Sequence, residues 1–468
     1  MNVLLAEAPY SYADFMVKGE RYFPLGLGYI ASYIRRVPGR SVRMFVGSLG
    51  QVRAEMKAHP PDVVGISSMT NTYPEAARLA RIARECRAGC RIILGGQHVS
   101  SVGADVLADV PEADFLCLGE GEIVMDRFLG EIESGREDWT GIAGLVARTP
   151  AGVREGPPAV LIDDVETLPF PARDLVDLSQ YKSHGQMRFG GRTASLITSR
   201  GCPWRCTYCS SNVTMGRKYR RRSAESVVAE FEELYRRHRV RTVVVWDDVF
   251  TLDAARVTAI CEGLVRKRIR VSWYCQSRTD QVTPEMAKVM RRAGCRAISF
   301  GIESGSERTL ERIRKNVDLG GVGRSIACCR DAGIRTQGTF ILGFPWETPD
   351  EMEETVGFAL KSGLDIAIFF GFMPFPGTDE WQFVPPEVRP TNVEGWRTFV
   401  CNNRLGRTWN RYLDDREMKA VLARAHWRFY MRPGQVLRIA ASTRSAADLL
   451  GIVQNALSLV SSVAGMTM

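Results

Sequence analysis

The stretch Ser199-Arg200-Gly201-Cys202-Pro203-Trp204-Arg205-Cys206-Thr207-Tyr208-Cys209 decides how the rest of the chain is interpreted. It places three cysteines in a CxxxCxxC pattern, and the neighbouring glycine and proline favour a tight loop on which the sulfurs could converge. A cubane iron–sulfur cluster needs four thiolates, and no nearby fourth cysteine completes the set. Three thiolate ligands would leave one iron open to bind another molecule.

A zinc site and a chance group of buried cysteines are the alternatives for this stretch. Structural zinc sites close with four ligands, yet no histidine or cysteine follows at zinc-finger spacing. We therefore favour an iron–sulfur cluster with one open coordination position.

The CxxxCxxC spacing after an apolar strand resembles the signature of the radical S-adenosylmethionine (SAM) enzymes. The resemblance implies that Cys202, Cys206 and Cys209 hold a [4Fe–4S] cluster. In that family the open iron binds the amino and carboxylate groups of SAM, and the reduced cluster cleaves SAM to methionine and a 5′-deoxyadenosyl radical. The residue before the third cysteine is typically aromatic, so Tyr208 is expected beside the adenine of SAM.

The composition is that of a large globular protein rather than a secreted or membrane protein. With 468 residues, 45% of them apolar and 25% charged, the chain is expected to form two or three domains. Its start, MNVLLAEAP, lacks the pattern of a signal peptide, and no stretch approaches the roughly 18 consecutive apolar residues of a membrane span. Twelve cysteines without an export signal indicate a reducing compartment, so we expect a cytoplasmic protein.

The net charge of +9 is concentrated in part at 217–222, a basic run just past the cysteine loop. This run is either a solvated approach to a helix or a surface that attracts an anionic substrate or a reductase. No basic tail or RNA-binding module is visible, so a nucleic-acid partner is not expected.

Residues 1–140 alternate short β-branched runs with amphipathic helical patterns, which predicts a doubly wound parallel sheet. The expected strands are 3–6, 42–46, 63–67, 91–94 and 115–118, and the clearest helices are 27–36 and 74–87. Ligands of such sheets bind beyond the carboxyl ends of the strands. Those ends carry Ser67, Ser68, Gly95, Gly96, Gly119 and Glu120.

This half of the chain is similar to the cobalamin-binding domain at the N-terminus of one large radical SAM subfamily. The matching segments are PLGLGYIASYIRR (24–36), PDVVGISSMT (61–70), ILGGQHVS (93–100) and LGEGE (118–122). The resemblance implies a Rossmann-like domain whose cobalamin nucleotide tail is lined by Ser67, Ser68, Gly95 and Gly96. Gly119 and Glu120 of the LGEGE segment are further cofactor-binding candidates.

Cobalamin domains often carry an Asp-x-His-x-x-Gly loop whose histidine ligates cobalt, but no histidine lies between Glu7 and Phe23. The radical SAM subfamily commonly lacks it too, so cobalamin would bind without a protein histidine below the cobalt. A degenerate domain that keeps the fold and binds nothing is the alternative. His98, which follows two glycines, either reaches the ligand or forms hydrogen bonds within its loop.

Residues 141–191 are interrupted by prolines and predict a linker, and 168–181 match the connector of the same subfamily. From 192 to 385 the alternation resumes, with expected strands at 194–198, 242–246, 271–275, 297–300, 339–342 and 366–370. Helices are expected at 224–238, 253–267, 284–292, 306–314, 321–332 and 350–361. Six strand–helix units are too few for a complete eightfold barrel and match the open partial (β/α)6 barrel of radical SAM enzymes.

Active residues of such barrels lie at the carboxyl ends of the strands. The second expected strand ends in Asp247-Asp248. By resemblance, Glu303 would hydrogen-bond the ribose of SAM, and Ser277 and Arg278 would lie near its methionine moiety. The segment GFPWET (343–348) would pack beside the adenine.

Residues 386–468 lose the alternation and predict a mainly helical region, with a helix at 414–430 and an apolar stretch at 449–463. In the subfamily this tail covers the barrel mouth and helps to shape the substrate pocket. A surface-lying amphipathic segment for a lipid substrate is the alternative.

These patterns and resemblances predict a cobalamin-dependent radical SAM enzyme. We expect methyl transfer from methylcobalamin to an unactivated carbon of a small-molecule biosynthetic intermediate, with an electron donor such as flavodoxin or ferredoxin. Radical cyclisation, rearrangement or oxidation with the same cofactors is one alternative. An RNA-modifying methylthiotransferase would need a second cluster, for which Cys86, Cys90 and Cys117 lack the loop spacing, and a cobalamin sensor without catalysis would leave the cysteine triad unexplained.

Overall fold

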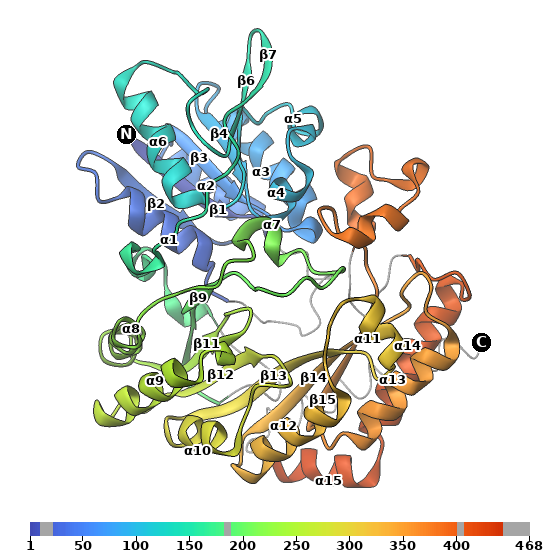
Figure 1. Ribbon diagram of the computed structural model, residues 1–468. Helices are drawn as coiled ribbons and strands as arrows, with labels where there is room; N and C mark the ends of the chain where they lie inside the picture. Colours follow the sequence, from blue (N-terminus) through green and yellow to red (C-terminus); the bar gives the residue numbers. More distant parts are fainter. Residues whose placement is uncertain (10–21, 182–188, 400–406, 443–468) are drawn as a thin grey trace.

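The computed structural model describes residues 1–9, 22–181, 189–399 and 407–442. Two sheets with their helices make up the molecule, and Figure 1 shows the first above the second, with the segment around α7 between them. The apolar stretch at 449–463 lies outside the described residues. No helix of the described residues is long and apolar enough to cross a membrane.

The first sheet has seven strands in the order β2-β1-β3-β4-β5-β6-β7. Its first five strands are parallel and confirm the predicted doubly wound sheet. They are β1 (Asn2–Glu7), β2 (Ser41–Phe45), β3 (Val63–Ser67), β4 (Arg91–Gly95) and β5 (Phe115–Cys117). The helices between and after them are α1 (Leu25–Ile34), α2 (Leu49–Ala58), α3 (Tyr73–Cys86), α4 (Gln97–Val102), α5 (Asp105–Asp109) and α6 (Gly121–Ser134).

Both faces of this sheet are buried, as a parallel sheet requires. In β1, Val3 and Leu5 belong to the core that contains side chains of α1 and α6. Leu4 and Ala6 point to the opposite face and join the core with side chains of α2 and α3. Successive side chains of a strand alternate between faces, so a strand that is apolar at every position is covered on both sides.

β6 (Leu145–Thr149) and β7 (Gly152–Glu155) extend the first sheet into residues that we expected in the linker. β6 pairs antiparallel with β5, and β7 pairs antiparallel with β6, so the sheet continues past residue 140. Leu145 and Val146 enter the cores on the two faces of the sheet, which explains why β6 joins it. A hairpin of two such short strands has too few residues to show a clear period in the sequence.

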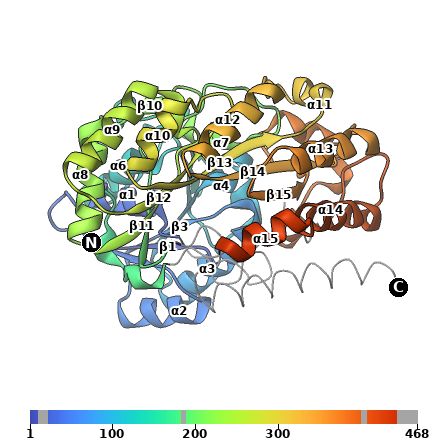
Figure 2. The same ribbon diagram turned by 90° about the horizontal axis from the view of Figure 1, so that it is seen from below.

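The second sheet has six parallel strands in the order β15-β14-β13-β12-β11-β8, which confirms the open partial barrel. Its strands are β8 (Arg192–Leu196), β11 (Val240–Val245), β12 (Ser272–Ser277), β13 (Cys295–Glu303), β14 (Arg335–Leu342) and β15 (Ile366–Gly371). Its outer helices, seen along one side of the sheet in Figure 2, are α8 (Ala224–Arg236), α9 (Ala254–Arg266), α10 (Pro284–Arg292), α11 (Glu307–Arg312), α12 (Leu319–Asp331) and α13 (Pro349–Lys361).

Helix boundaries in this half follow their capping residues. The Thr283 side chain accepts a hydrogen bond from the backbone at the start of α10, and Thr348 forms a capping box with Glu351 at the start of α13. Gly294 and Gly333 follow helices with φ values of 97° and 74°, a backbone conformation that favours glycine. Local side-chain chemistry thus sets where these helices begin and end.

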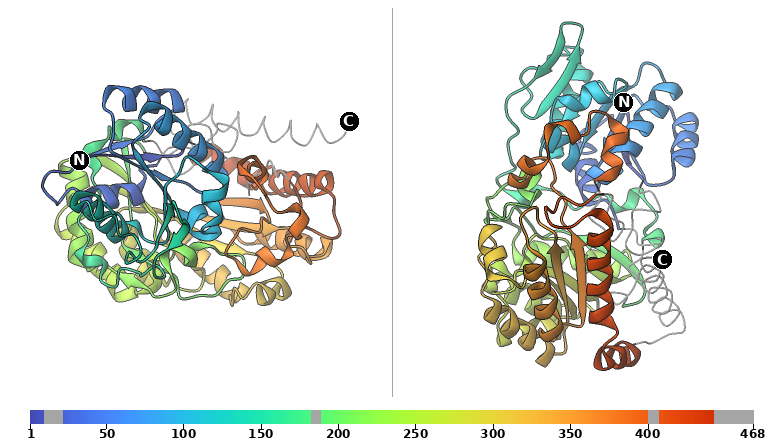
Figure 3. Two further views of the ribbon diagram at one scale, coloured as in Figure 1. Left: turned by 90° about the horizontal axis from the view of Figure 1, so that it is seen from above. Right: turned by 90° about the vertical axis from the view of Figure 1, so that its right-hand side faces the viewer.

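The chain after β15 contacts both halves of the molecule. A 3₁₀ helix at Val393–Thr398 packs against α3, and Trp396 and Phe399 enter the core of the first half. α14 (Asp415–Tyr430) then packs against β15, and α15 (Pro433–Ser442) follows it. Figure 3 shows this orange and red segment running from the first half down the side of the barrel. The described C-terminal region therefore ties the two halves together.

Candidate active site

The cysteine segment leaves the barrel after β8 and reaches α7 (Ser211–Met215). It begins with β9 (Ser199–Arg200), which pairs antiparallel with β10 (Arg220–Arg221). Between them Gly201 has a φ of 86°, and a Cβ atom there would lie 2.3 Å from the Lys218 carbonyl oxygen. Only glycine fits this turn, so the predicted tight loop depends on Gly201.

The three thiols lie on this loop and are all partly buried. Burial raises the pKa of Cys209 to about 11 and also raises the pKa of Cys202, and the charge of Cys206 adds to both shifts. The Cys206 sulfur lies 3.9 Å from the Arg314 carbonyl oxygen, and the described side chains form no ready-made group of three metal ligands. Iron binds the thiolate form, so a bound cluster would have to offset the cost that burial places on the Cys202 and Cys209 thiolates.

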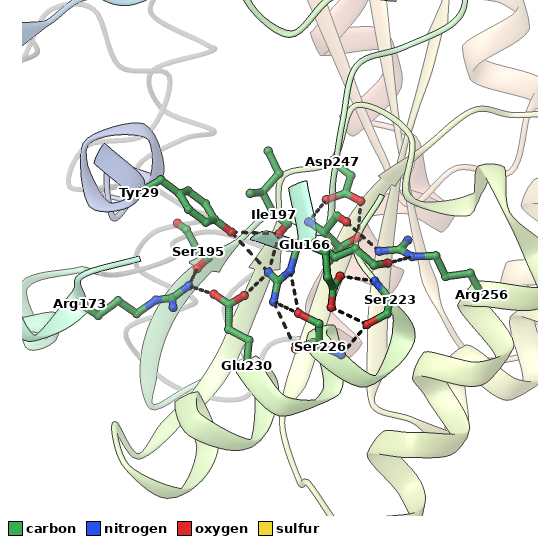
Figure 4. A network of polar contacts seen from close by, with 12 residues as sticks. Tyr29, Glu166, Arg173, Ser195, Ile197, Ser223, Ser226, Glu230, Asp247 and Arg256 are labelled. Carbon is green, nitrogen blue, oxygen red and sulfur yellow. Dashed lines mark hydrogen bonds and ion pairs between the residues drawn. The ribbon is translucent and has the colours of Figure 1, made fainter. Parts of the chain in front are cut away.

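Buried groups behind the loop hold its first residues. Asp247 accepts hydrogen bonds from the Thr198 backbone N–H at 2.5 Å and the Ser199 hydroxyl at 2.6 Å. Arg256 donates to the Thr198 carbonyl oxygen at 2.8 Å. Figure 4 shows Asp247 and Arg256 at the right-hand side of the network. The aspartate at the end of the second barrel strand therefore positions the cysteine loop.

The same network continues to α1 of the first half. Glu230 forms buried ion pairs with Arg173, at 2.6 Å, and with Arg222. Burial alone would raise the pKa of Glu230, but the two arginines outweigh it and hold the pKa below its usual value. Tyr29 lies within 3.4 Å of Arg222, so this network spans both halves of the molecule (Figure 4).

A second buried ion-pair cluster joins the LGEGE segment to β9 and β10. Arg200 donates to Glu120 at 2.8 Å and to Glu122 at 2.5 Å. Arg220 donates to Glu120 at 2.7 Å, and the Ile162 backbone N–H donates to the same carboxylate at 2.6 Å. We call these four charged residues the interdomain ion-pair cluster. They engage both oxygens of Glu120, so its predicted contact with a cofactor stays a prediction, while its contact with the cysteine strand is observed.

Glu303 and Tyr208, two predicted SAM contacts, lie in one cluster. Glu303 ends β13 with a φ of 73°, a strained conformation of a kind that concentrates at functional sites. Lys315 donates to Glu303 at 3.1 Å and lies 3.4 Å from the Tyr208 hydroxyl. The Tyr208 ring also meets Phe344 of the GFPWET segment edge to face, with ring centroids 6.2 Å apart. The structure thus brings these sequence-predicted contacts together.

Ser277 and Arg278, predicted near the methionine moiety, lie at the end of β12. The Ser277 hydroxyl lies 2.6 Å from the Thr251 hydroxyl and 2.7 Å from the Arg278 carbonyl oxygen. Arg278 pairs with Asp280 at 3.0 Å and lies over the Trp204 ring at 4.6 Å. Arg278 therefore contacts the cysteine loop, while contact of either residue with SAM stays a prediction.

The predicted cobalamin contacts gather at the carboxyl edge of the first sheet. Ser67 is paired with Gly95 across β3 and β4, and the Ser68 backbone N–H donates to the Gly95 carbonyl oxygen at 3.0 Å. Gly96 has a φ of 98°, and a Cβ atom there would lie 2.4 Å from the Ser68 carbonyl oxygen. Gly119, with a φ of 76°, donates to the Ser100 hydroxyl at 3.0 Å. A close-packed glycine edge of this kind leaves backbone accessible to a ligand.

One polar atom at this edge supports a bound ligand. The Ser68 hydroxyl is buried and has no hydrogen-bond partner within the described part of the chain. Buried hydroxyls are normally hydrogen-bonded, so an acceptor or donor from a bound molecule would complete it. The donor chemistry and the glycine edge therefore fit the nucleotide tail of cobalamin.

His98 is a core residue of the first half. Its ring lies between Tyr73, with centroids 4.1 Å apart, and Trp396, at 4.5 Å, and its Nδ1 lies 3.2 Å from the Thr70 hydroxyl. Burial lowers its pKa to about 3, so the ring is neutral. The contact with Thr70 agrees with the hydrogen-bonding alternative for this residue.

Asp248 has a position that the sequence did not assign. It accepts from the Ser211 hydroxyl at 2.8 Å, and its charge contributes to the raised pKa values of Cys202 and Cys209. Burial raises its own pKa. It is thus a carboxylate just past the end of β11 whose charge acts on the thiols, and the only sequence signal for it was a pair of acids after a strand.

Comparison with known proteins agrees with this architecture. The family described as the radical SAM superfamily matches residues 196–359, and the B12 binding domain matches residues 17–129. An uncharacterised methyltransferase of Pyrococcus horikoshii is 31% identical over 443 residues, which cover 94% of this chain and 94% of that protein. The anaerobic magnesium-protoporphyrin IX monomethyl ester cyclase of Rubrivivax gelatinosus is 28% identical, over 84% of this chain and 72% of that protein.

A similar fold occurs in TsrM of Kitasatospora setae, a radical SAM methyltransferase whose solved structure has tryptophan and a SAM analogue bound. The TM-score is 0.68 at 21% identity, over 81% of this chain and 74% of that chain. Family matches, relatives and fold agree with the three cysteines, the cobalamin-type sheet and the partial barrel described above. The chain therefore belongs to the cobalamin-binding radical SAM enzymes, whose cofactors are a [4Fe–4S] cluster, SAM and cobalamin.

Proposed function

We propose that this enzyme is a methyltransferase that moves the methyl group of methylcobalamin to an unactivated carbon of a small biosynthetic molecule. The observation that carries the proposal is the direct contact between the cysteine loop and the carboxyl edge of the first sheet. Gln97, at the start of α4, donates to Ser210, the residue after the last cysteine. Arg200, two residues before the first cysteine, pairs with Glu120 and Glu122. These contacts support one reaction space shared by the two proposed cofactor sites.

The chain's own residues would bind and orient the cofactors. Cys202, Cys206 and Cys209 would hold the cluster, and the Ser68 hydroxyl would hydrogen-bond the cobalamin tail. Glu303, held by Lys315, would accept from the ribose hydroxyls of SAM. When bound, the cluster and SAM supply the radical that removes hydrogen from the substrate, and methylcobalamin supplies the methyl group.

The first test is anaerobic reconstitution with iron, sulfide and hydroxocobalamin, followed by metal analysis and an ultraviolet–visible spectrum. We expect four irons and one cobalt per chain, by the stoichiometry of the two cofactors. Iron without cobalt would make the first half a degenerate domain, and zinc in place of iron would refute the mechanism. Cys206→Ala should abolish SAM cleavage but keep cobalamin, whereas a cobalamin sensor would have no SAM cleavage to lose.

The second test separates methylation from the cyclase-type alternative, which the Rubrivivax relative keeps open. Enzyme loaded with deuterated methylcobalamin is incubated with methyl-deuterated SAM, reductant and a cell extract, and products are found by mass spectrometry. A product that carries the label supports methyl transfer. A product that forms only with active enzyme and carries no label supports cyclisation, rearrangement or oxidation instead.

The methylthiotransferase alternative loses support from the first half. Cys90 and Cys117 are buried among core side chains, so they do not form a loop that could hold a second cluster. Our proposal keeps a small-molecule substrate, a cytoplasmic location and a flavodoxin-type or ferredoxin-type electron donor.

A further inference from the structure

A pocket of about 620 Å³ lies beside the cysteine loop. Three of its lining residues are arginines. We therefore call it the arginine pocket. It is lined by Thr207, Arg312, Arg314, Trp346, Thr378, Asp379, Glu380, Trp381, Gln382, Phe383 and Arg389. The described residues therefore form a concave surface next to the cluster ligands.

An apolar wall borders the arginine pocket, and Trp346 belongs to both. Leu310, Ile313, Phe344 and Phe372 are buried together in this wall, with Tyr208 packed against it. Thr207 and Tyr208 are consecutive, yet the Thr207 hydroxyl bonds to Glu380 in the pocket, while the Tyr208 hydroxyl meets Lys315 on the other side. Thr207 therefore contacts the pocket, whereas Tyr208 contacts the partner of Glu303, so the pocket lies on the Thr207 side of the cysteine loop.

The pocket wall touches the loop directly. The Cys206 sulfur lies 3.9 Å from the Arg314 carbonyl oxygen, and the Thr207 backbone N–H donates to the Ile313 carbonyl oxygen at 3.1 Å. A molecule seated in the arginine pocket would therefore be separated from a cluster ligand by little more than one residue.

The charge of the pocket favours an acidic partner. Arg312 lies over the Trp346 ring at 4.1 Å and Arg389 over the Trp381 ring at 5.5 Å, and neither forms an ion pair within the described part of the chain. Arg314 is paired with Asp379 at 3.1 Å, but 61% of its side chain is exposed. Cationic, aromatic surfaces of this kind attract carboxylates and raise association rates with acidic proteins.

Glu380 adds an unsatisfied group to this surface. It is 4% exposed, burial raises its pKa, and one of its carboxylate oxygens is buried without a hydrogen-bond partner in the described part of the chain. A carboxyl of raised pKa opposes the arginines less than an ionised one does. The net character of the pocket is therefore positive.

We propose that the arginine pocket docks an acidic protein that donates single electrons to the cluster, of the flavodoxin or ferredoxin kind. The proposal rests on the proposed function, because each reductive cleavage of SAM consumes one electron. With the cofactors bound, one electron from the reduced donor would reach SAM through the cluster and break one carbon–sulfur bond of the sulfonium, and the donor would be oxidised by one electron. Entry from the Thr207 side of the loop would leave the space between the two sheets to the substrate.

Binding of a bacterial flavodoxin in its oxidised form, measured by calorimetry on the reconstituted holoenzyme, tests the proposal without turnover. We expect saturable binding that weakens as salt is raised, and a loss of affinity of at least about tenfold in the Arg312→Glu/Arg314→Glu double variant. Lys288→Glu/Arg292→Glu, which replaces two exposed cations of α10, a helix remote from α11 in Figure 1, is the charge-matched control and should change the affinity less than about twofold.

The electron paramagnetic resonance signal of the dithionite-reduced cluster is recorded for each protein and shows whether the cluster is intact. With an intact cluster, equal affinity in wild type and double variant overturns the proposal, and so does a wild type that binds neither flavodoxin nor ferredoxin at low salt. SAM cleavage by the wild type with dithionite is measured separately. Its absence would count against the proposed function, whereas its presence with failed docking would count against the arginine pocket alone.

Discussion

Replacement of Glu120 by glutamine should loosen the cysteine loop more than replacement of Glu122. In the interdomain ion-pair cluster, Arg200 has two carboxylate partners, whereas Glu120 is the carboxylate partner of Arg220. In Glu120→Gln the buried Arg220 loses its carboxylate partner and keeps neutral acceptors, among them the carbonyl oxygens of Ile162 and Met215, each at 2.6 Å. An unpaired charge at a buried position costs about 3–5 kcal/mol.

In Glu122→Gln, by contrast, Arg200 keeps Glu120. The loss is then one charge-assisted hydrogen bond, about 1.5 kcal/mol. Since about 1.4 kcal/mol corresponds to a factor of ten, local opening of β9 and β10 should become about 100-fold to 4,000-fold more frequent in Glu120→Gln and about tenfold more frequent in Glu122→Gln. The backbone amides of these paired strands report this opening.

Hydrogen exchange followed by mass spectrometry measures this local opening on the peptide that spans Ser199 to Cys209. The control is Glu133→Gln, near the C-terminal end of α6, which removes an ion-pair partner of Arg40. It should leave the exchange rate of this peptide unchanged. Equal acceleration in the two variants, or none in Glu120→Gln, would refute the reasoning that Glu120 holds the loop. Cobalamin affinity, measured in parallel, shows whether Glu120 also contacts the cofactor.

Three further outcomes are expected. Gly201→Ala should lower the iron content after reconstitution, because its Cβ atom would meet the Lys218 carbonyl oxygen at 2.3 Å; normal iron loading would contradict this. Lys315→Met should weaken SAM binding, measured by calorimetry, because Glu303 loses the ion pair that orients its carboxylate; unchanged affinity would place the ribose elsewhere. Burial raises the pKa of Glu347 from 4.5 to about 8, so the folded protein holds a proton that the unfolded chain releases, and stability falls as pH rises from about 4.5 to 8. Glu347→Gln should flatten that dependence, read from urea midpoints, and an unchanged slope would show that Glu347 ionises normally.

Much of the architecture follows from local patterns. The strands of both sheets begin and end within a few residues of their expected positions, because β-branched runs and helical periods are read over short windows. The start of α10 at Pro284 and the end of α12 near Gly333 follow from capping chemistry that involves only adjacent residues. The β6–β7 hairpin was not predicted, because its strands are short and the strand with which it pairs, β5, is distant in the sequence.

The candidate site divides in the same way. Tyr208 and Glu303 were predicted from their motifs, and the structure joins them through Lys315, which no motif singled out. The sequence contained only a weak indication that Asp248 belongs to the site, and it indicated nothing about Glu347 beyond its place in the GFPWET motif. Their raised pKa values come from burial by surrounding elements, which a single sequence does not display.

By itself the sequence determined the three-cysteine loop, the two runs of strand–helix alternation and the glycine-rich strand ends, since each depends on residue types at short fixed spacing. Only the tertiary structure decided that Glu120 pairs with Arg200 rather than facing solvent, that Trp396 packs on His98, and that an arginine-lined pocket adjoins Cys206. Those contacts join residues far apart in the chain. Each sheet buries its own apolar core but leaves charged and aromatic side chains at its edges. These side chains find their partners only where the edges of the two sheets meet.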